Sequence, residues 1–181
     1  MLEFGPDGEP VSDKAPPVYK ERYIHAAIYG ARPDVHGVVH NHSEEVIPFG
    51  ITGVPLRPVF HSAARIGGTI PVWDIADRFG DTDMLVSNME QGRDLAATLA
   101  DNRVVLMRGH GATVAMPSLH MAVMTAIYAQ INARLQTTAL LMGNVKYLSP
   151  GELAMTTDLT VKGNLGANRT WEYYCRRAGF A

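Results

Sequence analysis

Two short apolar segments of this chain each lead into histidine, and this pattern constrains the fold and the chemistry more than any other feature. Residues 35–39 form a short, mainly apolar segment with three β-branched valines, as in a strand, and lead into His40 and His42. Residues 103–107 predict a second strand, which ends three residues before His110. An extended backbone places residues two apart on one face, so His40 and His42 would point the same way. If the two strand ends are neighbours, three imidazoles can hold one divalent metal and leave a position open for substrate.

The residues around these motifs allow further interpretations. Gly109 and Gly111 flank His110, and glycine lets a backbone turn sharply and approach a ligand closely. Taken alone, a His-X-His pair or a Gly-His-Gly run also arises without any metal, so an ordinary structural role stays open for both. His61 lies with Arg65 in a loop rich in glycine and proline, where it can bind substrate or simply face solvent.

Composition excludes several classes of protein. The chain has 181 residues, 46% of them hydrophobic, and 16 basic against 18 acidic side chains give a net charge of −2. These values fit one folded domain and lack the basic excess of a nucleic-acid-binding protein. Cys175 is the only cysteine, which excludes internal disulfides and cysteine-rich zinc modules. No apolar stretch reaches the roughly 20 residues that span a bilayer, and the start lacks a signal-peptide pattern. We therefore expect a cytoplasmic protein without nucleic-acid or membrane partners.

The rest of the sequence predicts an alternation of helices and short strands. Helices are expected over 18–31, from residue 43, over 91–100, between Ser118 and Gly143, and around 171–177; further strands are expected near 68–72 and over 112–115. Turns are expected at Asp7-Gly8 and at 149–152. In the long helix, apolar residues recur every four positions along one face: Leu119, Val123, Ile127, Ile131, Leu135 and Ala139. The pattern predicts an α/β or α+β fold, a single domain over 1–181 with a sheet covered by helices.

The order of the motifs is similar to that of the class II aldolase/adducin family, typified by fuculose-phosphate aldolase. The similarity extends from residue 1 to about 145 and rests on segments 21–25, 32–35, 38–43, 105–111 and 117–119. The resemblance implies a central, mainly antiparallel sheet and a divalent metal held by His40, His42 and His110. It also implies an acid/base role for Glu21, which by itself would be a solvated acid on a surface helix.

The resemblance further implies a C4 homotetramer with active sites at subunit interfaces, where a tyrosine of the tail, here Tyr174, can assist. Members of the family usually begin with an additional segment whose glycine- and serine-containing loop grips a substrate phosphate. We expect this domain to lack that segment, which makes a sugar phosphate a less expected substrate. Several stretches instead resemble the decarboxylase branch of the family: 72–75, 79–86, 132–136, 147–152 and 171–174.

These observations predict a metal-dependent carbon–carbon lyase. Breaking a carbon–carbon bond leaves electrons that must move onto an oxygen, and a Mn or Zn ion can stabilise the resulting enolate. We favour a decarboxylase of a hydroxylated aromatic or heteroaromatic acid, with Glu21 handling the proton and His61 and Tyr174 binding substrate. One alternative is an aldolase or epimerase acting on a sugar, sugar phosphate or hydroxy-ketone. A second is a non-catalytic, adducin-like interaction module, which would be expected to lack an intact set of three histidines.

Overall fold

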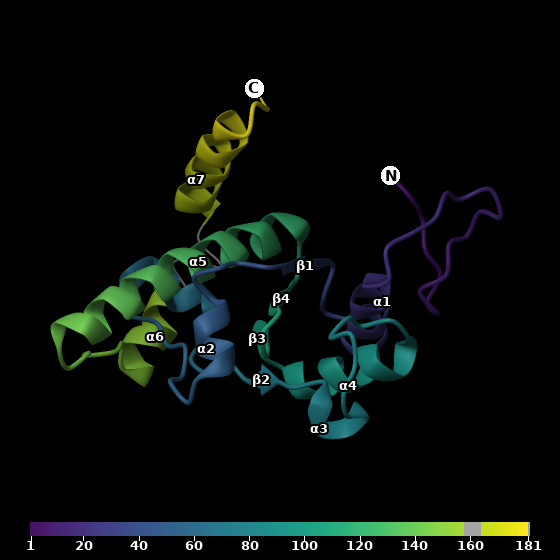
Figure 1. Ribbon diagram of the computed structural model, residues 1–181. Coiled ribbons are helices and arrows are strands. Elements are labelled where there is room, and N and C mark those ends of the chain that lie inside the picture. Colours follow the sequence, from purple (N-terminus) through teal and green to yellow (C-terminus); the bar gives the residue numbers. More distant parts are fainter. Residues whose placement is uncertain (158–163, 181) are drawn as a thin grey trace.

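A computed structural model describes residues 1–157 and 164–180 of the chain (Figure 1). In chain order its elements are α1 (Arg22–Ala31), β1 (Gly37–Asn41), α2 (Ile47–Ile51), the 3₁₀ helix η1 (His61–Ile66), β2 (Val72–Trp73), α3 (Ala76–Phe79), α4 (Met89–Leu99), β3 (Val104–Met107), β4 (Gly111–Met116), α5 (Leu119–Met142), α6 (Pro150–Thr157) and α7 (Asn164–Arg177). No helix within these ranges is both long enough and apolar enough to cross a membrane.

The four strands form one sheet in the order β1-β4-β3-β2. The pairs β1–β4 and β3–β4 are antiparallel, and only β2–β3 is parallel, so the expected mainly antiparallel sheet is confirmed. A tight connection joins β3 to β4, because Met107 is the register partner of Gly111. Asn41 at the end of β1 pairs with Ala112. The turn between β3 and β4 therefore lies directly beside the residues that follow β1.

Helices cover both faces of this sheet, as the sequence predicts. Helices α1 and α4 pack together on one side, and α5 crosses the other side (Figure 1). Strand β3 is completely buried between the two layers, with Val105 and Met107 in one core and Val104 and Leu106 in the other. This alternation is what a two-residue side-chain period requires of a strand covered on both faces.

The face that α5 buries differs from the predicted one. Within the apolar row, Leu119 and Leu135 are exposed and the others are partly exposed. The buried residues of the helix are instead Ala122, Met124, Thr125, Ala129, Asn132, Ala133 and Gln136. A row of every fourth residue advances by about 40° per step around a helix of 3.6 residues per turn, so six members cannot remain on one face. Small alanines allow the helix to lie close to the sheet.

Two fully buried amides of α5 hold the loop before η1. Gln136 accepts a hydrogen bond from the Arg57 amide at 2.9 Å and donates to the Pro55 carbonyl at 2.8 Å. Asn132 accepts from the Val59 amide and donates to the Arg57 carbonyl, both at 2.9 Å. Buried backbone groups need such partners, and here side chains replace a neighbouring strand. This explains how a loop rich in glycine and proline stays ordered beside the core.

Local sequence patterns determine where several helices and turns begin. Ser118 caps α5 by accepting a hydrogen bond from the Met121 amide. The expected hairpin at Asp7-Gly8 is present, since Phe4 and Pro10 form an antiparallel bridge. The predicted turn at 149–152 is wrong: Ser149 and Glu152 form a reciprocal capping box that starts α6. The short elements η1 and α3 were also not predicted.

Candidate metal centre

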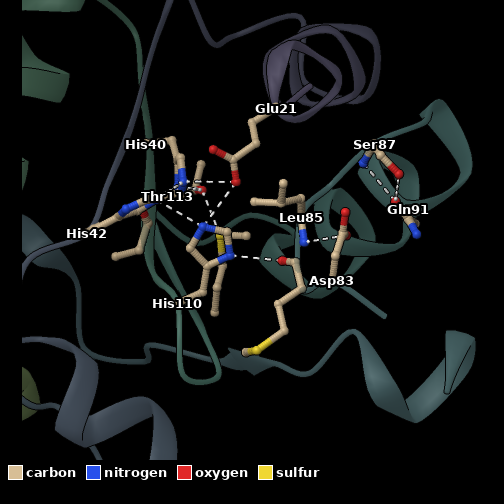
Figure 2. Close-up of polar contacts among 12 residues, drawn as sticks. Glu21, His40, His42, Asp83, Leu85, Ser87, Gln91, His110 and Thr113 are labelled. Carbon is tan, nitrogen blue, oxygen red and sulfur yellow. Dashed lines mark hydrogen bonds and ion pairs between the residues drawn. The ribbon is translucent and has the colours of Figure 1, made fainter. Parts of the chain in front are cut away.

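Four side chains from three separate segments meet at one point beside the end of β1. Glu21, His40, His42 and His110 each direct one possible ligand atom to the same place, and these atoms all lie within 4.8 Å of one another (Figure 2). The Nε2 atom of His42 lies 3.1 Å from that of His40 and 2.9 Å from that of His110. Oε1 of Glu21 lies 3.0 Å from Nε2 of His110 and 3.4 Å from Nε2 of His40.

The sheet register brings the three histidines together. His40 is the penultimate residue of β1, and His42 follows the strand on the same side. His110 stands in the β3–β4 turn, where Gly109 adopts a left-handed backbone with φ of 64°. Strand β4 then approaches β1 so closely that a Cβ atom on Gly111 would lie 2.1 Å from the Asn41 carbonyl oxygen. Only glycine fits there, and its absence of a side chain allows the two motifs to meet.

Backbone carbonyls set the orientation of two imidazoles. Nδ1 of His40 lies 3.1 Å from the Ala112 carbonyl oxygen, and Nδ1 of His110 lies 2.9 Å from the Met84 carbonyl oxygen. A carbonyl oxygen only accepts hydrogen bonds, so in each neutral ring the hydrogen resides on Nδ1. The lone pair of Nε2 then points toward the centre of the cluster. Such outer contacts are typical of metal-bound histidine.

The donor set fits a cation. The Nε2 lone pairs of His40 and His110 both face Nε2 of His42, and Glu21 Oε1 is buried without a hydrogen-bond partner among the described residues. Ligands about 2.0–2.1 Å from a tetrahedral Zn²⁺ would lie about 3.3–3.4 Å apart, close to the nitrogen separations seen here. Burial, together with the charges of His110 and His42, lowers the pKa of His40 to about 4. His40 therefore keeps a free lone pair at neutral pH.

The structure does not join His61 or Tyr174 to this cluster. His61 is exposed at the start of η1. Tyr174 lies on α7 in a cavity with Val123 and Ile127 of α5, and its ring contacts Tyr173 edge-on. Within the described part of this single chain no contact links either residue to the histidines, so substrate binding by both stays a prediction.

The Met84 and Ala112 carbonyl groups cannot be recognised from the sequence as parts of the site, because any residue type supplies a carbonyl. In the sequence, segment 79–86 is distinguished only by its resemblance to the decarboxylase branch of the family. A polar pattern in that segment does mark a tight turn: Thr82 Oγ1 accepts a hydrogen bond from the Met84 amide at 3.0 Å, and Asp83 Oδ1 accepts one from the Leu85 amide at 3.1 Å. Threonine and aspartate at such positions indicate a turn in the sequence, because their side chains accept hydrogen bonds from backbone amides two residues further on.

Comparison with known proteins gives the chain its family. The model of the class II aldolase and adducin N-terminal domain matches residues 1–137. Decarboxylase tropJ of Talaromyces stipitatus is 34% identical over 96% of this chain and 72% of its own length. The 3,4-dihydroxyphthalate decarboxylase of Arthrobacter keyseri is 29% identical over 87% of this chain, which spans only 62% of that relative.

Solved structures agree on the fold. An aldolase II superfamily protein from Pseudomonas syringae superimposes with a TM-score of 0.74 at 22% identity, covering 97% of this chain and 70% of that one. An L-fuculose 1-phosphate aldolase from Glaciozyma antarctica gives the same TM-score at 19% identity, over 98% and 68% of the two chains. The chain belongs to the class II aldolase and adducin family.

Proposed function

We propose that this chain is a metal-dependent carbon–carbon lyase, and that it decarboxylates a hydroxylated aromatic or heteroaromatic acid. The observation that supports this most is the convergence of three imidazole Nε2 atoms beside a buried Glu21 oxygen that has no hydrogen-bond partner in the part of the chain that the structure describes. Similarity to proteins named as decarboxylases and as aldolases supports the lyase class. The decarboxylase reading is preferred because the tropJ match is longer and higher in identity than the match to L-fuculose phosphate aldolase of Escherichia coli, which is 28% over 75% of this chain.

The three histidines would hold one Mn or Zn ion as neutral ligands. When bound, such an ion acts as a Lewis acid toward substrate oxygens and stabilises the negative charge that a breaking carbon–carbon bond sends to them. His40 and His110 are well suited to this role, because their side chains are only 9% and 8% exposed and their Nδ1 atoms are already bonded. Ligands that are already oriented strengthen electrostatic stabilisation of the charge that develops on the substrate.

Glu21 would hold and move the proton. Its side chain enters from the N-terminal end of α1 and is 16% exposed, so it can reach both the cluster and an incoming substrate. After carbon dioxide leaves, the ring or enolate carbon must accept a proton, and a carboxyl group beside that carbon can donate it. Such general acid–base assistance typically contributes about 10²–10⁴ in rate.

An aldolase or epimerase remains the alternative within the same chemistry. Aldol cleavage needs the same ligand set and the same acid/base group, and the family includes L-fuculose phosphate aldolase. The two reactions differ in product: one releases carbon dioxide, the other an aldehyde. A non-catalytic, adducin-like module is disfavoured because all three histidines are present and converge.

We also propose a cytoplasmic homotetramer in which His61 and Tyr174 contribute to substrate binding. Apolar side chains left uncovered at the end of α5 support association, among them Leu140, Leu141 and Met142. Tyr174 lies far along the chain on α7, which is a suitable place from which a tail residue could serve a neighbouring site.

The test combines metal analysis with a screen of hydroxylated aromatic acids for carbon dioxide release. Glu21→Gln should retain the metal and lower turnover by about 10²–10⁴, whereas His42→Ala should lose metal and turnover together. Glu44→Gln is the matched control, because this nearby acid is exposed. Near-normal turnover in Glu21→Gln would exclude the acid/base role, and wild-type protein that binds no divalent metal would exclude the proposed function.

A further inference from the structure

A strained backbone lies behind one of the three histidines. Within residues 1–157 and 164–180, only Met84 and Ala100 combine a side chain with a left-handed φ, at 63° and 47°. Such conformations cost energy for a residue with a Cβ atom, and they persist only where the surroundings enforce them. Met84 is the one that touches the candidate metal centre: its carbonyl oxygen lies 2.9 Å from Nδ1 of His110.

The loop around Met84 is held in place on both sides. Thr82 Oγ1 and Asp83 Oδ1 accept hydrogen bonds from the amides of Met84 and Leu85, respectively. Lys20 forms an ion pair with Asp83 at 3.0 Å, which connects the residue before Glu21 to the residue before Met84. The loop is therefore tied to itself, as the Asp83–Leu85 contact in Figure 2 shows, and through Lys20 to the segment that delivers the carboxylate.

Met84 also contacts the turn that carries His110. A Cβ atom built on Gly109 would lie 3.1 Å from Cε of Met84. Gly109 has a φ of 64°, so two left-handed residues face each other, one in each of the segments that meet at His110. The side chain of Met84 covers the turn, while its carbonyl group fixes the ring that the turn presents.

We infer that Met84 is a positioning residue of the metal centre, acting through its backbone. The left-handed conformation turns the carbonyl oxygen toward His110, keeps the hydrogen of that ring on Nδ1, and leaves the Nε2 lone pair directed at the cluster. In an ordinary extended or helical conformation the same carbonyl would point elsewhere, and the ring could rotate or exchange its hydrogen between the two nitrogens. The inference rests on the proposed metal site, but it concerns a feature that the metal-free protein already has.

The experiment compares Met84→Ile, Met84→Gly and Ala100→Ile. Isoleucine is β-branched and strongly disfavours a left-handed backbone, whereas glycine adopts it freely and retains the carbonyl group. Ala100 is a matched control: it also has a left-handed φ, and its carbonyl also accepts a side-chain hydrogen bond, from Arg32 at 2.6 Å, but it lies at the end of α4. Each variant is measured for Zn²⁺ affinity by competition with a chelator, and for the His110 tautomer by ¹⁵N NMR of the metal-free protein.

Met84→Ile should weaken Zn²⁺ binding by about 10–100-fold, as loss of an outer contact to a ligand usually does. Its NMR spectrum should show a mixture of the two neutral tautomers of His110, because the ring hydrogen then exchanges between Nδ1 and Nε2. Met84→Gly and Ala100→Ile should keep the wild-type affinity and the Nδ1–H tautomer. Equal loss in Met84→Gly would show that the side chain matters instead, and equal loss in Ala100→Ile would show general destabilisation; either result overturns the inference. Should Met84→Ile not fold, Met84→Val takes its place with the same expectations. Wild-type protein that binds neither Zn²⁺ nor Mn²⁺ defeats the proposed function, while the tautomer measurement still tests Met84.

Discussion

Replacing Gly111 with alanine should separate the two histidine motifs. A Cβ atom there would lie 2.1 Å from the Asn41 carbonyl oxygen and 3.1 Å from the Cα atom of His42, whereas ordinary contacts begin near 3.4 Å. Strands β1 and β4 would have to move apart by the difference, 3.4 − 2.1 = 1.3 Å, at the point where His42 leaves β1. Metal sites tolerate about ±0.2 Å in ligand distance. We expect Gly111→Ala to weaken Zn²⁺ binding by about 100-fold or more, at the upper end of what indirect changes around a site produce.

Gly37→Ala is the matched control for this prediction. Gly37 begins the same strand, and a Cβ atom there would lie 2.4 Å from the backbone of Ser118 and Leu119. Both variants should lose about 1–3 kcal/mol of unfolding free energy through overpacking, measured by urea denaturation of the metal-free proteins. Only Gly111→Ala should also lose Zn²⁺ affinity in a chelator competition assay. Wild-type affinity in Gly111→Ala would refute the reasoning, as would an equal loss of affinity in Gly37→Ala.

Two further predictions concern stability. Asn132→Leu leaves the Val59 amide and the Arg57 carbonyl without their buried partners. It should lower the unfolding free energy, measured by urea denaturation, by about 2–5 kcal/mol. The control Thr137→Ala, on the exposed side of α5, should change the unfolding free energy by less than about 0.5 kcal/mol. In metal-free protein the pKa of His40 is lowered from its ordinary 6.5 to about 4, so the unfolded chain binds the proton first as the pH falls. The unfolding free energy should therefore decrease between about pH 6.5 and pH 4 by about 3 kcal/mol, and a smaller decrease in His40→Gln, measured with a chelator present, confirms the assignment; equal slopes would contradict it.

The histidines were predictable from the sequence because their positions follow from strand geometry. A two-residue side-chain period puts His40 and His42 on one side, and a short β3–β4 connection brings His110 to them. Glu21 was different, since nothing in its own surroundings distinguishes it from other acids on a helix. The resemblance to the class II aldolase family singled it out, and the structure then placed its Oε1 atom 3.0 Å from His110.

Two kinds of contact could not be predicted from the sequence. Some are made by backbone atoms, and others depend on which loop passes beside a helix in the folded chain. The Met84 carbonyl could come from any residue type, and only its conformation makes it useful. Asn132 and Gln136 look like residues of an exposed helix face, because a helical pattern cannot show that a loop without a strand partner passes beside them. They are buried because the backbone of residues 55–59 needs hydrogen-bond partners, and these two side chains supply them.

Helix α5 buries a different face from the predicted one because of this requirement, and the apolar residues that remain exposed are relevant to the proposed oligomer. A helix that must satisfy the backbone of a neighbouring loop has to turn its amides inward, and small residues such as Ala129 and Ala133 accompany them so that the helix can approach. Two larger apolar residues of the predicted row, Leu119 and Leu135, then lie outward, and at the end of the helix Leu141 is 85% and Met142 83% exposed. Monomeric proteins seldom leave contiguous large apolar side chains uncovered. The same feature that made the sequence misleading about the core therefore supports the proposed association of several copies of the chain.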